Sequence, residues 1–227
     1  MPIIILGMHR SGTSALTGTL QEQGLHLGDV STDSIQNSKG NRELSIVQSL
    51  NEDVLRKNGG SWANPPYQVS WSPFQREVQN MIISQLSHST RPWGFKDPRT
   101  LLVLDGWQEA APDAKFVGTF RHPLQVAASL EARDGMTRSK ALQLWLYYND
   151  LLLQQHSKQG FPLIEFEADA ERMARKFEKL SSLLCLQATE APAFYTPNLI
   201  HNHDNDQGMA AELVILYEEL KKRELQI

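Results

Sequence analysis

Apolar residues form four short runs that alternate along the chain with longer segments of helical periodicity. The short runs are rich in β-branched and aromatic residues and cover residues 3–6, 93–96, 115–121 and 162–166. Apolar runs of this length, bounded by turn residues, are typical of buried strands. The pattern therefore predicts four strands.

Eight further segments place apolar residues at intervals of three and four, which predicts amphipathic helices. They cover residues 14–23, 43–57, 72–88, 100–111, 123–133, 137–156, 169–184 and 209–224, whereas residues 188–207 have no regular pattern. Strands that alternate with helices predict an α/β fold. We expect a three-layer structure, a parallel sheet flanked by helices on both faces.

Composition narrows the class of protein. The chain has 227 residues, of which 41% are apolar, and we expect residues 1–227 to form a single domain. A formal charge of −4 argues against a general nucleic-acid-binding protein. The lone cysteine, Cys185, fits a reducing compartment. The apolar start is too short for a signal peptide and no segment has the length of a membrane span. We therefore expect a cytoplasmic protein without stable membrane insertion.

Polar clusters follow three of the predicted strands at the point where each strand ends. The clusters read GMHRSGTS after the first strand, KDPR after the second and RHP after the third. In parallel α/β sheets, ligands bind at the carboxyl ends of the strands. We therefore expect these three clusters to form one binding site.

The first cluster has the glycine spacing of a nucleotide-binding P-loop but lacks its lysine. Gly7 and Gly12 are in place, and the next two residues, where Lys and Ser or Thr are expected, are Thr13 and Ser14. Successive backbone N–H groups and the start of the following helix can still bind an anion. The cation within the loop is Arg10. This pattern argues against triphosphate hydrolysis and favours a smaller anion.

Two motifs together resemble the sulfotransferases that use 3′-phosphoadenosine 5′-phosphosulfate (PAPS), in particular the bacterial branch with its P-loop-type fold. RSGTS resembles the family's 5′-phosphosulfate loop, and Arg121, Pro123 and Ser129 have the spacing of its 3′-phosphate segment. The resemblance implies that Arg121 and Ser129 bind the 3′-phosphate. It assigns the 5′ end of the donor to six residues, His9, Arg10, Ser11, Gly12, Thr13 and Ser14.

Three weaker motifs agree with this resemblance. GFKDPRT resembles a Lys-Asp-Pro motif, which implies that Lys96 lies near the bridging oxygen of the donor. Residues 37–55 resemble a bacterial Asn-Pro-x-Gly-aromatic-x-Glu segment in which Glu43 keeps the acidic position, although Ser38 replaces the proline. Residues 166–169 are a degenerate version of the family's Tyr-Glu-Asp-Leu strand end.

The implied reaction moves a sulfuryl group to a hydroxyl of a small-molecule, lipid or carbohydrate acceptor and releases adenosine 3′,5′-bisphosphate (PAP). Such transfer depends on positioning and charge stabilisation, here without a metal. Arg10 and Lys96 would stabilise the leaving group. For the catalytic base, Glu43 is the first candidate, Asp97 the second and His9 the third, although Asp97 could instead pair with Arg99 or orient Lys96.

Two other functions stay open on the sequence. A nucleotide kinase-like protein would need a substitute for the missing P-loop lysine. A non-catalytic homologue would keep the PAPS or PAP pocket but carry degenerate catalytic segments. Trp62, Trp71 and Tyr67 lie in a Pro-rich loop, where exposed aromatic rings could stack on an acceptor. His201 and His203 indicate an acceptor-side or donor-covering loop rather than a metal site.

Overall fold

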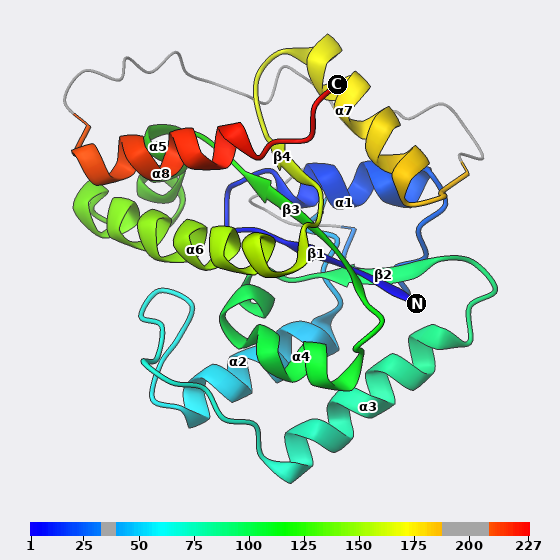
Figure 1. Ribbon diagram of the computed structural model, residues 1–227. Helices are drawn as coiled ribbons and strands as arrows, with labels where there is room; N and C mark the ends of the chain where they lie inside the picture. Colours follow the sequence, from blue (N-terminus) through cyan, green and yellow to red (C-terminus); the bar gives the residue numbers. More distant parts are fainter. Residues whose placement is uncertain (33–39, 188–208) are drawn as a thin grey trace.

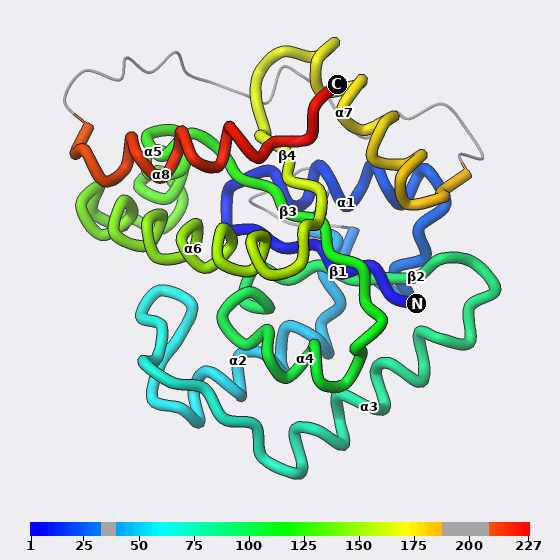
Figure 2. The backbone as a smooth tube through the Cα atoms, viewed as in Figure 1, coloured from blue at the N-terminus to red at the C-terminus, as the bar shows by residue number. Residues whose placement is uncertain are grey.

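A computed structural model describes residues 1–32, 40–187 and 209–227. Its sheet has four parallel strands in the order β2-β1-β3-β4 (Figure 1). The strands are β1 (Pro2–Leu6), β2 (Trp93–Lys96), β3 (Lys115–Phe120) and β4 (Leu163–Glu165). Figure 2 shows β1 running between β2 and β3, and every residue of β1 is buried. The four predicted strands and their parallel arrangement are confirmed.

Helices cover both faces of the sheet, as the alternating pattern predicts. The helices are α1 (Thr13–Glu22), α2 (Ser45–Lys57), α3 (Pro73–Ser87), α4 (Leu104–Ala110), α5 (Pro123–Asp134), α6 (Arg138–Gln159), α7 (Ala170–Leu183) and α8 (Ala211–Lys222). Figure 1 shows α1 and α7 on the side of the sheet opposite to α2, α3 and α4. The α/β, three-layer prediction is therefore confirmed.

The alternation of side chains along β1 divides the core into two parts. Ile3 and Ile5 pack with residues of α1 and α7, whereas Ile4 and Leu6 belong to the larger cluster formed with the other helices. Successive residues of a strand point to opposite faces, so a strand buried on both sides is apolar throughout. This is why residues 3–6 form an unbroken apolar run.

The predicted helix 100–111 differs from the structure at its start. The chain forms a 3₁₀ helix, Pro98–Val103, which is followed by α4. The Asp97 side chain caps this 3₁₀ helix by accepting from the backbone N–H of Arg99 at 3.4 Å, and Pro98 occupies the first turn. Pro has no N–H to lose at that position, so the turn begins directly after β2. The other predicted helices agree to within a few residues at each end.

Buried polar contacts attach α8 to the end of β4. Glu224 accepts from the backbone N–H of Glu165 at 3.1 Å and pairs with the buried ammonium of Lys176 at 2.5 Å. Tyr217 donates its hydroxyl to Glu165, and Leu225 donates its N–H to the carbonyl of Leu163 at 2.8 Å. These contacts hold α8 beside α6, where the two helices pack together.

Within the described ranges, no helix combines the length and apolar character that crossing a membrane requires.

Candidate functional site

The parallel register brings the ends of three strands to one edge of the sheet. Ile5 of β1 pairs with Lys96 of β2, and Leu6 pairs with Gly118 of β3. The loop after β1 therefore starts between the segments that follow β2 and β3. All the sequence-predicted site residues lie at this edge or directly beneath it.

The loop after β1 turns sharply into α1. Arg10 and Gly12 have positive φ angles of 68° and 82°. A side chain at Gly12 would overlap the ring of Phe166, since an added Cβ would lie 2.2 Å from it. Gly12 caps α1 without any side-chain hydrogen bond, so the first N–H groups of the helix remain available to an anion. The hydroxyl of Ser11 is buried and has no partner within the described part of the chain.

Arg10 meets Arg121 and Ser129, although it precedes both of them by more than a hundred residues in sequence. Nε of Arg10 donates to Oγ of Ser129 at 2.7 Å. Nη1 of Arg121 donates to the carbonyl of Arg10 at 3.4 Å, and Nε of Arg121 donates to Gln125 at 3.0 Å. The guanidinium of Arg121 lies over the ring of Phe166. The two predicted anion motifs therefore form one continuous surface.

Lys96 provides a second cation at the start of α1. Its ammonium lies 3.3 Å from Oγ of Ser14 and 2.7 Å from Oε1 of Glu43. Only 1% of the Lys96 side chain and 12% of Glu43 are exposed. Burial lowers the pKa of Lys96, and the carboxylate of Glu43 opposes that shift. An ammonium from β2 thus reaches the loop that lacks a lysine of its own.

Asp97 lies beneath this ion pair and is fully buried. It pairs with Arg99 at 2.7 Å and accepts from Nδ2 of Asn51 at 2.8 Å. Asn51 also donates to Thr100 and accepts from the indole of Trp107 at 2.9 Å. Asp97 therefore serves to hold β2 and the following turn in place. Its carboxylate also raises the pKa of Arg99, against the opposing effect of burial.

Asn51 belongs to this network although its sequence position was given no role, whereas Arg99 was expected as an alternative partner of Asp97. Asn51 is buried on a face of α2 that is otherwise made of Val47, Leu50, Val54 and Leu55. A polar residue at the centre of an apolar stripe signals a buried hydrogen-bond network. That signal was available in the sequence, whereas the partners of Asn51 were not.

His9 occupies the inner wall of the loop. Its ring packs on Trp62, with centroids 4.5 Å apart, and the guanidinium of Arg133 lies 5.6 Å from the centre of that indole. Burial lowers the pKa of His9 well below its usual value, and the cations Arg99, Arg133, Lys96 and Arg10 add to the shift. The imidazole is therefore neutral at physiological pH, and its Nε2 has no hydrogen-bond partner in the part of the chain described.

The aromatic residues of the Pro-rich loop have three different environments. Trp62 lies against His9, whereas Trp71 packs on Trp107 with ring centroids 5.9 Å apart, and Tyr67 is 98% exposed. Trp62 is therefore the aromatic ring of this loop that borders the site. Asn37, Ser38, His201 and His203 lie outside the described residues.

Cations dominate this edge of an otherwise acidic chain. Arg10, Lys96 and Arg121 surround the first turn of α1, whose N-terminus carries a further partial positive charge. Across residues 1–32, 40–187 and 209–227, no group of three or more His, Cys, Asp or Glu side chains could hold a metal ion. The arrangement can bind an extended anion with charges at two separate points.

Comparison with known proteins identifies the family. A sequence profile described as the sulfotransferase family matches residues 2–159, which is more than half of the chain. The chain belongs to the sulfotransferase family. The matched residues include both anion motifs, Lys96 and Glu43. No curated protein matches this chain in sequence.

The sulfotransferase domain of a cyanobacterial olefin synthase shares the fold of this chain. The sulfotransferase domain of the Synechococcus PCC 7002 olefin synthase superimposes with a TM-score of 0.59 at 18% identity, covering 100% of this chain and 95% of that chain. Sulfotransferase STF1 from Mycobacterium tuberculosis H37Rv gives a TM-score of 0.44 at 14% identity, covering 97% and 76%. The first comparison agrees with the fold described above.

Replacing Asp97 tests its structural role. We expect Asp97→Asn to lower the free energy of unfolding by about 3 kcal/mol, because it leaves the buried guanidinium of Arg99 with less compensating charge. Asp105→Asn, in the exposed first turn of α4, is the control and should cost less than about 1 kcal/mol. Urea unfolding at pH 7 measures both variants. Equal effects would contradict a structural role for Asp97.

The lowered pKa of His9 predicts a dependence of stability on pH. Below about pH 6.5 the unfolded chain takes up a proton at His9 that the folded protein excludes, so stability falls as the pH drops. His9→Gln should remove up to about 1.4 kcal/mol of this loss per pH unit. Urea midpoints between pH 5 and 7.5 measure it, with the exposed His88→Gln as control. An unchanged slope in His9→Gln would refute the neutral, buried imidazole.

Proposed function

We propose that this sulfotransferase moves a sulfuryl group from PAPS to a hydroxyl of a small-molecule, lipid or carbohydrate acceptor. The contact between Arg10 and Ser129, with Arg121 beside it, is the observation that carries this proposal. This contact connects two segments. The loop after β1 is suited to bind one phosphate, and the segment after β3 is suited to bind another. A nucleotide with charged groups at both its 5′ and 3′ positions matches that pair of sites.

Each end of the donor has its own set of groups. The 5′-phosphosulfate would lie against the N–H groups of the loop and the hydroxyls of Ser11, Thr13 and Ser14, at the positive end of α1. The 3′-phosphate would lie against Arg121 and Ser129. The Ser129 oxygen accepts from Arg10 and keeps its own proton to donate to a phosphate oxygen.

Sulfuryl transfer then requires positive charge near the leaving phosphate oxygen and a base near the acceptor oxygen. The acceptor oxygen bonds to sulfur while the bond from sulfur to the 5′-phosphate oxygen breaks, and PAP leaves. Lys96 and Arg10 stabilise the charge that grows on that phosphate. The acceptor hydroxyl gives its proton to a base on the opposite side of the sulfuryl group.

Glu43 fits the role of base better than Asp97 or His9. Its Oε1 accepts from Lys96, which leaves Oε2 for the acceptor hydroxyl. Asp97 is fully buried and already bonded to Arg99 and Asn51. His9, neutral and packed on Trp62, is suited to contact the acceptor instead.

The two alternative functions make different predictions. A kinase-like protein is less favoured because Lys96 lies between Ser14 and Glu43 rather than on the loop itself. A non-catalytic homologue would bind PAP and fail to turn over PAPS. The Lys96–Glu43 pair supports a catalytic protein, since a buried ammonium and a largely buried carboxylate lie together at the point where transfer would occur.

Nucleotide affinity tests the donor site. We expect PAP to bind more tightly than AMP or ATP, and Arg121→Ala to weaken PAP binding by about 10- to 100-fold, because it removes charge-assisted hydrogen bonds. AMP affinity should change little, as AMP has no 3′-phosphate. Arg56→Ala, an exposed arginine of α2, is the matched control. Isothermal titration calorimetry makes the measurement, and equal affinity for PAP and AMP would refute the proposed donor.

Turnover tests the catalytic pair. With PAPS and a panel of alcohols, phenols and sugars, we expect Lys96→Met to slow PAP release by about 10²- to 10³-fold. Glu43→Gln should slow it by about 10²- to 10⁴-fold. Both variants should still bind PAP. Wild-type protein that binds PAP and turns over PAPS with none of these acceptors would favour the non-catalytic alternative.

A further inference from the structure

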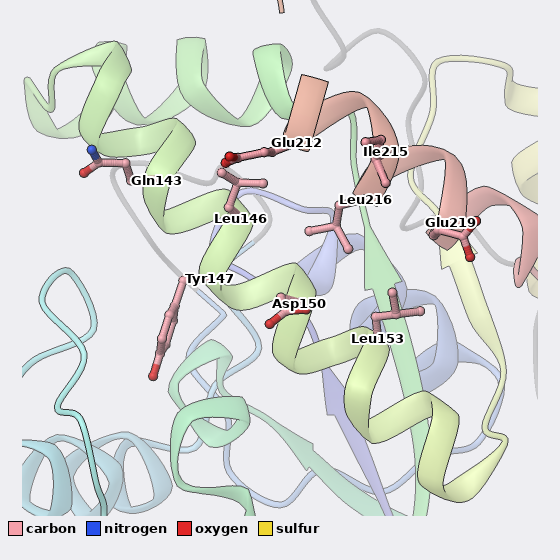
Figure 3. Close-up of a pocket in the computed structure, with 9 residues that line it drawn as sticks. All are labelled: Gln143, Leu146, Tyr147, Asp150, Leu153, Glu212, Ile215, Leu216 and Glu219. Carbon is pink, nitrogen blue, oxygen red and sulfur yellow. The ribbon is translucent and has the colours of Figure 1, made fainter. Parts of the chain in front are cut away.

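A groove of about 610 Å³ lies between α6 and α8, on residues that the proposed reaction does not use (Figure 3). Leu146 and Leu153 of α6 contribute to its floor together with Leu216 of α8, and all three also pack against the core. The volume is about twenty times that of a water molecule in the liquid, so the groove has room for several side chains.

The lining residues form one stripe on each helix. On α8 they recur at 212, 215, 216 and 219, and on α6 the stripe begins at 143, 146, 147 and 150. This spacing of three and four residues marks a single face of each helix. Two such stripes side by side form the channel into which the ridge of a third helix packs. The shape therefore suits a helix rather than an extended peptide.

The apolar side chains of this groove are unusually exposed. Ile215 is 64% exposed and Tyr147 is 42% exposed, and the neighbouring Val214 is 38% exposed. Single exposed apolar residues are common, but here the exposed Ile215 lines the same groove as the partly buried Leu146, Leu153 and Leu216, and such a group indicates an interaction surface. The occupant should therefore bring apolar side chains of its own.

Among the residues that the structure describes, all the charged ones that line the groove are acidic. They are Asp150 on α6 with Glu212 and Glu219 on α8. Asp150 accepts from Gln154, and hydrogen bonds from Lys222 and Arg223 lower the pKa of Glu219 to about 2, so this carboxylate stays ionised. An occupant that carries Lys or Arg beside its apolar residues matches this rim.

We propose that the α6–α8 groove binds an amphipathic helix of another protein, one whose apolar face is flanked by Lys or Arg. Helices bind such grooves through apolar side chains at intervals of three and four residues. The basic flanks would pair with Asp150 and Glu212, while leucine-sized side chains would cover Ile215 and Leu216. The partner contacts none of the residues assigned to the donor.

Charge makes other occupants a poorer match. A second copy of the chain docking groove to groove would place acidic rims against each other, which is unfavourable. Residues 188–208 of this chain contain no Lys or Arg and include Pro192 and Pro197. Proline disfavours a helix interior, so that sequence does not match the occupant proposed.

A pair of synthetic peptides tests the proposal. One is a helix of about five turns made of leucine and lysine, with leucine at intervals of three and four, and the other replaces every lysine by glutamate. We expect the lysine peptide to bind the full chain and to shift the methyl resonances of Leu146, Leu153 and Ile215. Asp150→Lys combined with Glu212→Lys should weaken the binding of the lysine peptide by about tenfold and should favour the glutamate peptide.

The control keeps the same change of charge on another helix. Glu171→Lys combined with Glu178→Lys on the exposed face of α7 should leave peptide affinity unchanged, and all variants should still bind PAP. The proposal is wrong if the α7 pair weakens the peptide equally, or if the shifts map elsewhere. It is also wrong if the chain forms dimers that Ile215→Asp dissociates. If the chain does not bind the lysine peptide but still binds PAP, the docking proposal is wrong and the proposed sulfuryl transfer is unaffected.

Discussion

Parallel pairing of β1 with β2 and β3 is the constraint on which the rest of the structure depends. The register places Lys96 opposite Ile5 and brings the segment after β3 beside the loop that follows β1. Arg10, Lys96 and Arg121 come from three separate parts of the sequence, and only this pairing brings them to one edge. A shift of the register of β1 would move the loop that follows it away from Lys96 and Arg121 and so disperse the cations.

Each buried cation near the site has a carboxylate partner that compensates its charge. The ammonium of Lys96 is balanced by Glu43, and Arg99 is balanced by Asp97 and Glu52. Asn51 links Asp97 to Trp107, and so to the core. Isolated buried charges are strongly unfavourable, whereas paired and hydrogen-bonded ones are tolerated. The net charge of the whole chain therefore says little about the charge of its site.

Helix α6 connects the site with the far side of the molecule. Trp145 donates to the carbonyl of Arg121 at 2.9 Å, and Tyr148 donates to the carbonyl of Trp62 at 3.0 Å. The opposite stripe of the same helix lines the groove shared with α8. The contacts of Tyr217, Glu165 and Glu224 hold α8 in place at the end of β4. One rigid helix thus supports the donor-side backbone and presents the proposed docking surface.

The sequence by itself determined the four strands, their alternation with helices and hence the parallel sheet. It also determined the two anion motifs. All of these depend on local periodicity and on short spacings. The sequence did not determine the 3₁₀ start after β2, the buried position of His9 or the network around Asn51. Those features depend on which distant side chains meet. Asp97 was a candidate base for which pairing with Arg99 was the alternative, and only the tertiary structure showed that its buried carboxylate contacts both Arg99 and Asn51. Local patterns are encoded within a few residues, whereas burial and pairing are properties of the folded chain.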